Sequence, residues 1–195
     1  MIDDFVFKLK YARYNKQEKR RETWNESVQR YIRMLKDKFT DESKELYEIE
    51  QAMLNKEILP SMRGLQFGGD AVKEKNMRLY NCTCSYADRP KFFSEALWLL
   101  LCGSGVGFSV QRHHVNNLPK IKDIRSKETF IVPDSIEGWS DAVDKLFNAY
   151  FFTQSLPIFD YSQIREEGAP LRHGGHAPGL EPLKKAIDAI QKILD

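Results

Sequence analysis

Cysteine is scarce in this sequence, and its number is odd. The three cysteines among 195 residues are too few for a disulfide framework, which is typical of proteins in a reducing compartment. The sequence opens with Met1-Ile2-Asp3-Asp4 and lacks the basic segment and apolar stretch of a signal peptide. Its longest apolar run, residues 96–102, is far shorter than the roughly 20 residues that span a bilayer. We therefore expect a cytoplasmic protein that does not cross a membrane.

An excess of charge of either sign is also absent. The 30 basic and 28 acidic residues leave a net charge of +2, so we expect neither a nucleic-acid-binding nor a membrane-binding surface. Hydrophobic residues make up 42% of the chain, enough for a sizeable core. The sequence therefore predicts one ordinary globular domain or part of a larger one.

Residues 1–57 predict a charged helical region. Thr23 is followed three residues later by Glu26, which is the spacing of a capping box at the start of a helix. The helix that follows has an apolar stripe at helical spacing, made of Val28, Tyr31, Ile32 and Leu35. We expect this helix to pack against a second one, and we find no chemistry in either.

Residues 58–195 predict an α/β arrangement. From residue 78 onward the expected order is strand, helix, strand, strand, helix, strand, loop and helix. The first strand is expected over 78–86 and the next helix over 92–102, buried because it is apolar almost all round. The last helix is expected over 181–194.

The glycine-rich segment CGSGVGF, residues 102–108, invites comparison with a nucleotide-binding loop. Phe108 stands where the dinucleotide-binding pattern requires a third glycine, and the loop leaves a helix and enters a strand, the reverse of the required order. The Gly-Lys-Ser/Thr ending of a P-loop is also missing. The segment therefore favours a helix-to-strand turn, whose glycines allow a flat ligand to approach the backbone closely.

A metal site is one possible interpretation of the cysteines and histidines. Structural zinc sites prefer longer spacings than the one residue between Cys82 and Cys84 and the two glycines between the histidines of 173–176. The neighbouring His113 and His114 would point in different directions on a strand. We therefore expect no metal site, and the two glycines favour a mobile hinge.

Cys82 and Cys84 share one face of the expected strand with Tyr80 and Tyr86, because side chains alternate between faces. Residues i and i+2 of an extended strand have Cα atoms roughly 6.5–7 Å apart, at or beyond the limit for a disulfide. If either thiol does redox chemistry, its partner should therefore come from another element. The alternative is that both are small buried hydrophobic side chains.

Six segments of the sequence are, in order, LPSMRGL, YNC, CGSGVGFSVQR, VPDSIEGWSDA, DYSQIREEGAPLR and GGHAPGLEPL. Together they resemble one protein family, the catalytic chains of ribonucleotide reductases, in the adenosylcobalamin-dependent type called class II. The resemblance covers nearly the whole chain. It implies an N-terminal helical region over 1–57, followed over 58–195 by the first portion of a ten-stranded α/β barrel. The implied activity is the conversion of ribonucleotides to 2′-deoxyribonucleotides for DNA synthesis by thiyl-radical chemistry, with adenosylcobalamin as the cofactor.

The resemblance also implies roles for individual residues. Cys82 matches one cysteine of the redox pair, whose partner lies on a different strand and which a thioredoxin-like reductant restores. Cys84 and Cys102 match no family role. The positions that match the substrate-binding region are Ser61, Asn81, Gly103, Ser104 and Gly105.

Two further groups match the regulatory part of the family. Asp88 and Arg112 match positions near a deoxynucleotide effector, which tunes the choice of substrate base. The loop that couples effector to substrate matches Arg172, His173, Gly174, Gly175, His176 and Ala177. After this loop the chain reads Pro178-Gly179-Leu180 where the family has Ser-Gly-Pro.

The family's radical cysteine, second redox cysteine and most cobalamin contacts come after the matched region. The resemblance therefore implies an N-terminal portion that is inactive without the C-terminal remainder, and a homodimer is a further possible assembly. In a complete barrel the apolar face of residues 183–194 should pack on strands, some of them from that remainder. Two alternatives stay open: a nucleotide-binding regulatory module without catalysis, and a fragment of a class I reductase.

Overall fold

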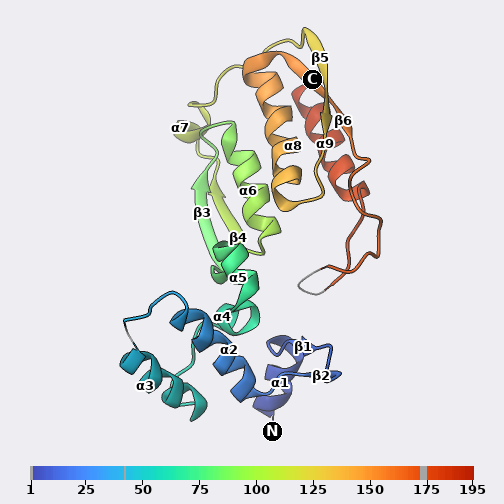
Figure 1. Ribbon diagram of the computed structural model, residues 1–195. Helices are drawn as coiled ribbons and strands as arrows, with labels where there is room; N and C mark the ends of the chain where they lie inside the picture. The colour runs from blue at the N-terminus through green and yellow to red at the C-terminus, as the bar shows by residue number, and fades with distance from the viewer. Residues whose placement is uncertain (1, 42, 172–174) are drawn as a thin grey trace. The chain divides into compact units, whose positions relative to one another are not determined.

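The chain folds into two compact units, Met1–Asn81 and Cys82–Asp195, in a computed structural model that describes residues 2–41, 43–171 and 175–195 (Figure 1). The division between residues 57 and 58 stays a prediction. Among the described residues, no helix has the length and apolar character that crossing a membrane requires.

The first unit is helical. Its elements are α1 (Ile2–Lys10), β1 (Tyr14–Asn15), β2 (Arg20–Arg21), α2 (Trp24–Lys36), α3 (Ser43–Leu54), α4 (Met62–Phe67), α5 (Asp70–Glu74) and the 3₁₀ helix η1 (Asn76–Leu79). The expected capping box begins α2: the Thr23 side chain accepts from the Glu26 backbone N–H, and the Glu26 side chain accepts from that of Thr23. Buried Val28 and Ile32 of α2 pack with Met53 of α3. The predicted pair of packed helices is therefore confirmed.

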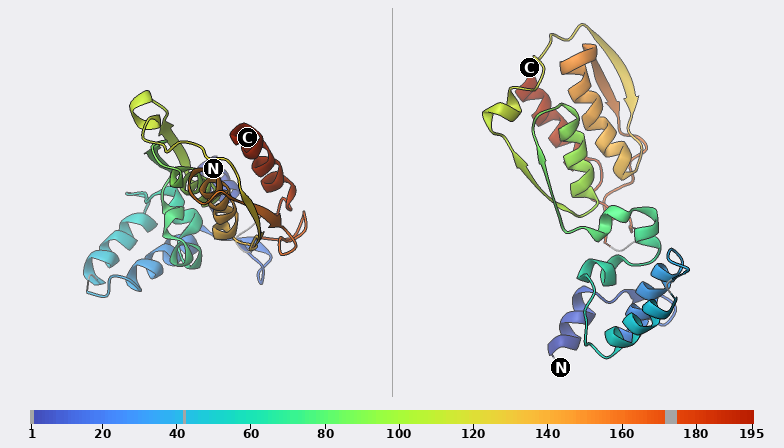
Figure 2. Two further views of the ribbon diagram at one scale, coloured as in Figure 1. Left: turned by 90° about the horizontal axis from the view of Figure 1, so that it is seen from above. Right: turned by 90° about the vertical axis from the view of Figure 1, so that its left-hand side faces the viewer.

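The second unit alternates strands and helices. Its elements are β3 (Cys82–Tyr86), α6 (Lys91–Leu101), β4 (Gly105–Ser109), α7 (Arg112–Val115), β5 (Ser126–Ile131), α8 (Ile136–Asn148), the π-helical segment η2 (Ala149–Thr153), β6 (Ser155–Asp160) and α9 (Glu181–Leu194). The strands form two parallel pairs, β3 with β4 and β5 with β6. One helix crosses over within each pair, and these two helices, α6 and α8, lie side by side (Figures 1 and 2). The predicted α/β order is therefore confirmed.

Aromatic and polar contacts join α6 to α8. The rings of Phe93 and Phe147 stack with centroids 4.0 Å apart. Ser94 Oγ donates to Asp144 Oδ1 over 3.0 Å, and Ser140 Oγ donates to the Ser94 carbonyl over 2.7 Å. These contacts hold the two crossover helices together and thereby the strands that each helix connects.

The apolar face of α9 packs inside the second unit. Leu183 and Ile187 are buried in a core that includes Val132, Leu146 and Tyr150, with side chains of β5 and β6 around it. Strands of this chain therefore pack on this face, while the expected contribution of strands from further sequence stays a prediction.

The first strand is shorter than predicted. It begins at Cys82, because the backbone N–H of Tyr80 instead closes a 3₁₀ turn on the Met77 carbonyl over 3.1 Å. Of the two tyrosines expected beside the cysteines, only Tyr86 lies in the strand. A local turn has therefore replaced the first part of the expected strand.

Two further expectations were wrong in this region. Helix α6 is buried mainly at Phe92 and Ser94, and its Leu100 is 53% exposed, because the helix packs against α8 on one side. His113 and His114 lie in the helical turn α7, where the His114 N–H donates to the Gln111 carbonyl over 2.9 Å. Their rings consequently lie close together, with centroids 3.9 Å apart.

Candidate functional site

The parallel pairing of β3 and β4 places both cysteines of β3 opposite glycines. Cys82 pairs with Gly105, and Cys84 pairs with Gly107. Both cysteines are exposed free thiols, whereas Cys102 is buried. Thr83 lies between them, and its Oγ1 donates to the Gly105 carbonyl over 3.2 Å. The cysteines thus line an open face of the strand, and the alternative in which both are buried hydrophobic side chains does not hold.

The turn between α6 and β4 brings the predicted glycine segment to the same place. The Gly103 N–H donates to the Leu100 carbonyl over 2.9 Å, and the Ser104 N–H donates to the Leu99 carbonyl over 3.0 Å. Gly103 has φ 92°, a left-handed conformation that favours glycine at the end of a helix. The predicted helix-to-strand turn is therefore confirmed. It places Gly103 and Ser104 immediately before Gly105, the pairing partner of Cys82.

Ser61 and Asn81, the other two predicted substrate-binding residues, belong to the first unit. Ser61 is exposed and directly precedes α4. Asn81 is exposed and directly precedes Cys82. Its Oδ1 accepts a hydrogen bond from Arg63 Nε over 3.0 Å. The sequence analysis did not single out Arg63, although it lies in the LPSMRGL segment that carried the resemblance.

Asp88 and Arg112 both lie beyond the carboxyl ends of β3 and β4, at the end of the strand pair that is opposite to Cys82 and Gly105. Strand β3 ends at Tyr86 and β4 at Ser109, and the Ala87 N–H continues the pairing by donating to the Ser109 carbonyl over 3.0 Å. Because the strands are parallel, residues that follow them come to one edge of the sheet. Asp88 Oδ1 accepts from Arg89 Nη1 over 2.7 Å, and Arg112 is exposed. The two predicted effector residues therefore share an edge.

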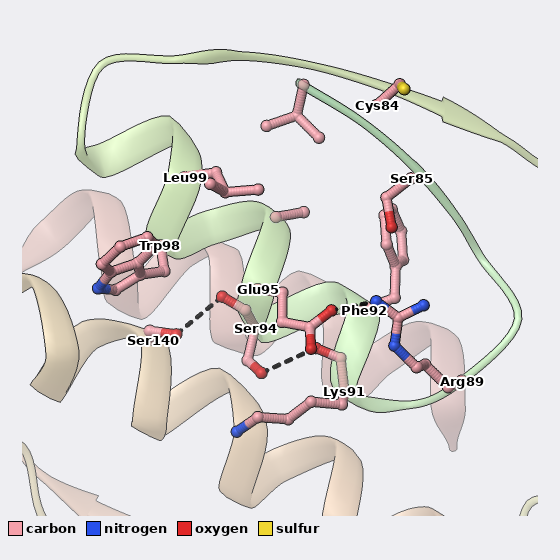
Figure 3. Close-up of a pocket in the computed structure, with 12 residues that line it drawn as sticks. Cys84, Ser85, Arg89, Lys91, Phe92, Ser94, Glu95, Trp98, Leu99 and Ser140 are labelled. Carbon is pink, nitrogen blue, oxygen red and sulfur yellow. Dashed lines mark hydrogen bonds and ion pairs between the residues drawn. The ribbon is translucent and has the colours of Figure 1, made fainter. Parts of the chain in front are cut away.

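A hollow of about 450 Å³ lies beside α6 (Figure 3). Its charged residues are paired: Arg89 bonds Glu95, and Lys91 Nζ lies 3.1 Å from Asp144 Oδ1. Among the described residues, the lining of this hollow includes Cys84 but none of the residues predicted to act in catalysis, substrate binding or effector binding. The hollow therefore borders β3 at Cys84 and is not lined by the predicted site residues that the structure describes.

The predicted coupling loop is described only at its end. Arg172, His173 and Gly174 lie outside the described residues. The other three predicted positions are Gly175, His176 and Ala177, and they form a short antiparallel pairing with the chain that precedes the loop.

Individual hydrogen bonds define this pairing. The Leu171 N–H donates to the Gly175 carbonyl over 3.0 Å, and the Ala177 N–H donates to the Ala169 carbonyl over 2.8 Å. Gly179 follows with φ 70°, and a Cβ there would lie 3.2 Å from the Glu167 nitrogen. A glycine at position 179 therefore suits both the backbone conformation and the close approach of residue 167.

No model of a known protein family matches the chain. It is 29% identical to a probable adenosylcobalamin-dependent ribonucleoside-triphosphate reductase of Dictyostelium discoideum, over 100% of this chain and 30% of that protein. It is 26% identical to the adenosylcobalamin-dependent ribonucleoside-triphosphate reductase of Euglena gracilis, over 99% of this chain and 30% of that protein. The resemblance to class II ribonucleotide reductases is confirmed.

A solved structure of a B12-dependent (class II) ribonucleotide reductase matches the fold of this chain. The TM-score is 0.79 at 22% sequence identity, over 97% of this chain and 36% of that one. The chain thus spans about a third of the length of the reductases that it matches. The mixed helix-and-sheet fold therefore matches part of a class II reductase structure, and the described strands form separate pairs.

Proposed function

We propose that this chain is the N-terminal part of a class II ribonucleotide reductase, which converts ribonucleotides to 2′-deoxyribonucleotides in the cytoplasm for DNA synthesis. Its two strand pairs form the first part of a ten-stranded α/β barrel that further sequence completes. The observation that carries the proposal is the exposed Cys82 opposite Gly105, in a chain matched over its whole length by reductases.

Cys82 acts as one thiol of a redox pair. Replacing the 2′-hydroxyl of a ribonucleotide by hydrogen releases water and consumes two electrons and two protons, which two thiols supply as they become a disulfide. Cys84 is two residues away on the same extended strand, which is unsuitable for a disulfide, and Cys102 is buried. As the resemblance implies, the second thiol comes from the remainder of the reductase, and a thioredoxin-like reductant restores the pair.

As the resemblance implies, Ser61 and Asn81 of the first unit contribute a hydroxyl and an amide to the phosphate and ribose of the substrate. The backbone of 103–105, in the second unit, passes the base. The exposure of Gly103 and Gly105 supports this assignment, because their lack of side chains leaves the backbone accessible to a flat ring.

A deoxynucleotide effector binds at the other edge of the β3–β4 pair, where Arg112 contacts phosphate and Asp88 a ribose hydroxyl. The common edge that the parallel strands give these residues supports a shared ligand. Residues 172–177 couple this site to the substrate, and a second copy of the chain is a further proposed partner.

Adenosylcobalamin is the proposed cofactor because the relatives are adenosylcobalamin-dependent. Among the described residues, no three His, Cys, Asp or Glu side chains are grouped as metal ligands. The resemblance places most cobalamin contacts of the family after the matched region, so we expect them in the remainder of the reductase. When bound, the cofactor supplies the radical that starts the reaction. The role of Cys82 is confined to the thiol chemistry.

The test uses a reductase assembled from this chain and the polypeptide that supplies the remaining strands. Cys82→Ser should abolish multiple turnover with a dithiol reductant, whereas the matched variant Cys84→Ser should retain it. Full turnover by Cys82→Ser would remove the central assignment. If the unaltered assembly binds deoxynucleotides but reduces no ribonucleotide, the regulatory module replaces this proposal.

A further inference from the structure

Arg63 and Asn81 are joined by a hydrogen bond that links two parts of the first unit. Arg63 lies in the second position of α4, and Asn81 follows η1, eighteen residues further along the chain. The Arg63 Nε donates to Asn81 Oδ1 over 3.0 Å. A side chain on a helix thereby restrains the residue directly before the proposed redox thiol.

The guanidinium of Arg63 is held by an aromatic ring of its own helix. Its Cζ lies 5.4 Å from the centroid of the Phe67 ring, within the range of a cation–π contact. Arg78 lies over the same ring at 5.9 Å, and its buried Nε has no hydrogen-bond partner. The planar group of Arg63 is thus placed by Phe67 as well as by Asn81. Arg78 provides a cation on the same ring for comparison.

The chemistry of the two groups fixes the direction of the amide. Arginine has only donors, so Asn81 must turn its oxygen toward Arg63. Its Nδ2, which carries two N–H donors, then faces away from the guanidinium. Asn81 is exposed, so those donors are available to a ligand.

We propose that Arg63 is a positioning residue, which orients the Asn81 amide so that Nδ2 donates to an oxygen of the ribonucleotide. This inference rests on the proposed function and deepens it. Without Arg63 the Asn81 amide rotates, and for part of the time it presents its oxygen to the ribonucleotide. That oxygen repels the oxygen of the ribonucleotide that Nδ2 otherwise contacts. The ribonucleotide then binds less tightly, while the thiol chemistry of Cys82 is affected less.

The test measures KM and kcat for the ribonucleotide in the assembled reductase. Arg63→Met should raise KM by about tenfold and lower kcat less, since a hydrogen bond to the substrate is weakened. Arg63→Lys should restore part of the loss because it keeps a cationic donor. The matched control Arg78→Met removes a cation from the same ring and should leave KM within about a factor of two.

A double-mutant cycle separates positioning from a general structural effect. If Arg63 acts through Asn81, then Arg63→Met should add almost nothing to the KM of an Asn81→Ala variant. Should Arg63→Met prevent folding, as judged by circular dichroism, Arg63→Lys replaces it in the cycle. The inference would be overturned if the effects of Arg63→Met and Asn81→Ala on KM multiply in the double variant, or if Arg63→Met alone leaves KM unchanged. Either result applies only when the unaltered enzyme reduces ribonucleotides. An unaltered enzyme that reduces no ribonucleotide overturns both this inference and the proposed function.

Discussion

Cys82 and Gly105 lie directly opposite one another in the parallel pairing of β3 and β4. Residues paired in this way point to the same face of a sheet, and glycine has no side chain to cover its neighbour. Because the turn at Gly103 begins β4 directly after α6, this pairing also brings the glycine segment beside the thiol. One feature of the backbone therefore explains both the exposure of Cys82 and its proximity to the proposed substrate-binding segment.

A side chain at position 105 should therefore obstruct the proposed site. We expect Gly105→Ala to lower kcat/KM for the ribonucleotide by roughly tenfold or more, because the new methyl group lies beside the Cys82 thiol and displaces the substrate. The matched control is Gly107→Ala beside Cys84, where a Cβ would lie 3.8 Å from the Thr83 carbonyl oxygen, an ordinary contact. Steady-state kinetics of both variants makes the comparison. Equal effects would contradict the special position of residue 105.

Effector binding should depend on Asp88 and Arg112. Each is expected to make a charge-assisted hydrogen bond to the deoxynucleotide, so Asp88→Ala and Arg112→Ala should each raise its dissociation constant by about tenfold or more. Equilibrium binding of the deoxynucleotide to the assembled reductase measures this. Arg125→Ala, which removes an exposed arginine just before β5, serves as the charge-matched control. Unchanged affinity in both test variants would place the effector elsewhere.

The first unit should lose stability when Glu22 is neutralised. Its carboxylate accepts hydrogen bonds from Arg30 Nε over 2.8 Å and Nη2 over 2.7 Å, and from Ser27 Oγ over 2.9 Å. Arg30 in turn donates to the carbonyl of Leu65, within α4, over 2.7 Å. Glu22→Gln should therefore lower the free energy of unfolding at pH 7 by about 2 kcal/mol. Urea unfolding of the chain measures the change, and the exposed Glu18→Gln should change it little.

The same carboxylate gives the first unit a dependence on pH. Burial by itself raises the pKa of Glu22, but the hydrogen bonds and charge of Arg30, with those from Ser27 and the Arg13 backbone, outweigh it and leave the pKa below its usual 4.5. A carboxylate whose pKa is lowered by folding stabilises the protein, and this stabilisation is fully present above pH 4.5. The stabilisation is lost as the pH falls through the lowered pKa. The difference between the unaltered chain and Glu22→Gln should therefore shrink in acid. A constant difference would contradict this role.

Local signals predicted well where neighbours in sequence decide the structure. The capping box of Thr23 and Glu26 and the bounds of α9 are confirmed, because hydrogen bonds and apolar spacing within a few residues determine them. Tyr80 was placed wrongly in the strand, because the local sequence pattern before Cys82 is compatible with both a strand and a 3₁₀ turn. His113 and His114 were placed wrongly because β4 ends four residues before His113 and gives way to a helical turn.

Contacts between distant residues were beyond reach of the sequence. The hydrogen bond from Arg63 to Asn81 depends on how η1 returns the chain to α4, which no spacing encodes. Similarly, the pattern of α6 shows that it is apolar, but only the packing on α8 determines which of its faces is covered. The pairing of Cys82 with Gly105 was also unpredicted, since the sequence placed Gly105 in the glycine-rich turn and specified no register between the two strands.

The most direct measurement follows the thiol of Cys82 through one turnover. The assembled reductase, reduced in advance and freed of reductant, is given adenosylcobalamin and a ribonucleotide, and its cysteines are mapped by mass spectrometry after selective alkylation. The account predicts that the amount of deoxynucleotide formed equals the amount of a disulfide that contains Cys82. Cys84 and Cys102 should be alkylated as free thiols. Deoxynucleotide formed with Cys82 still a free thiol would contradict it.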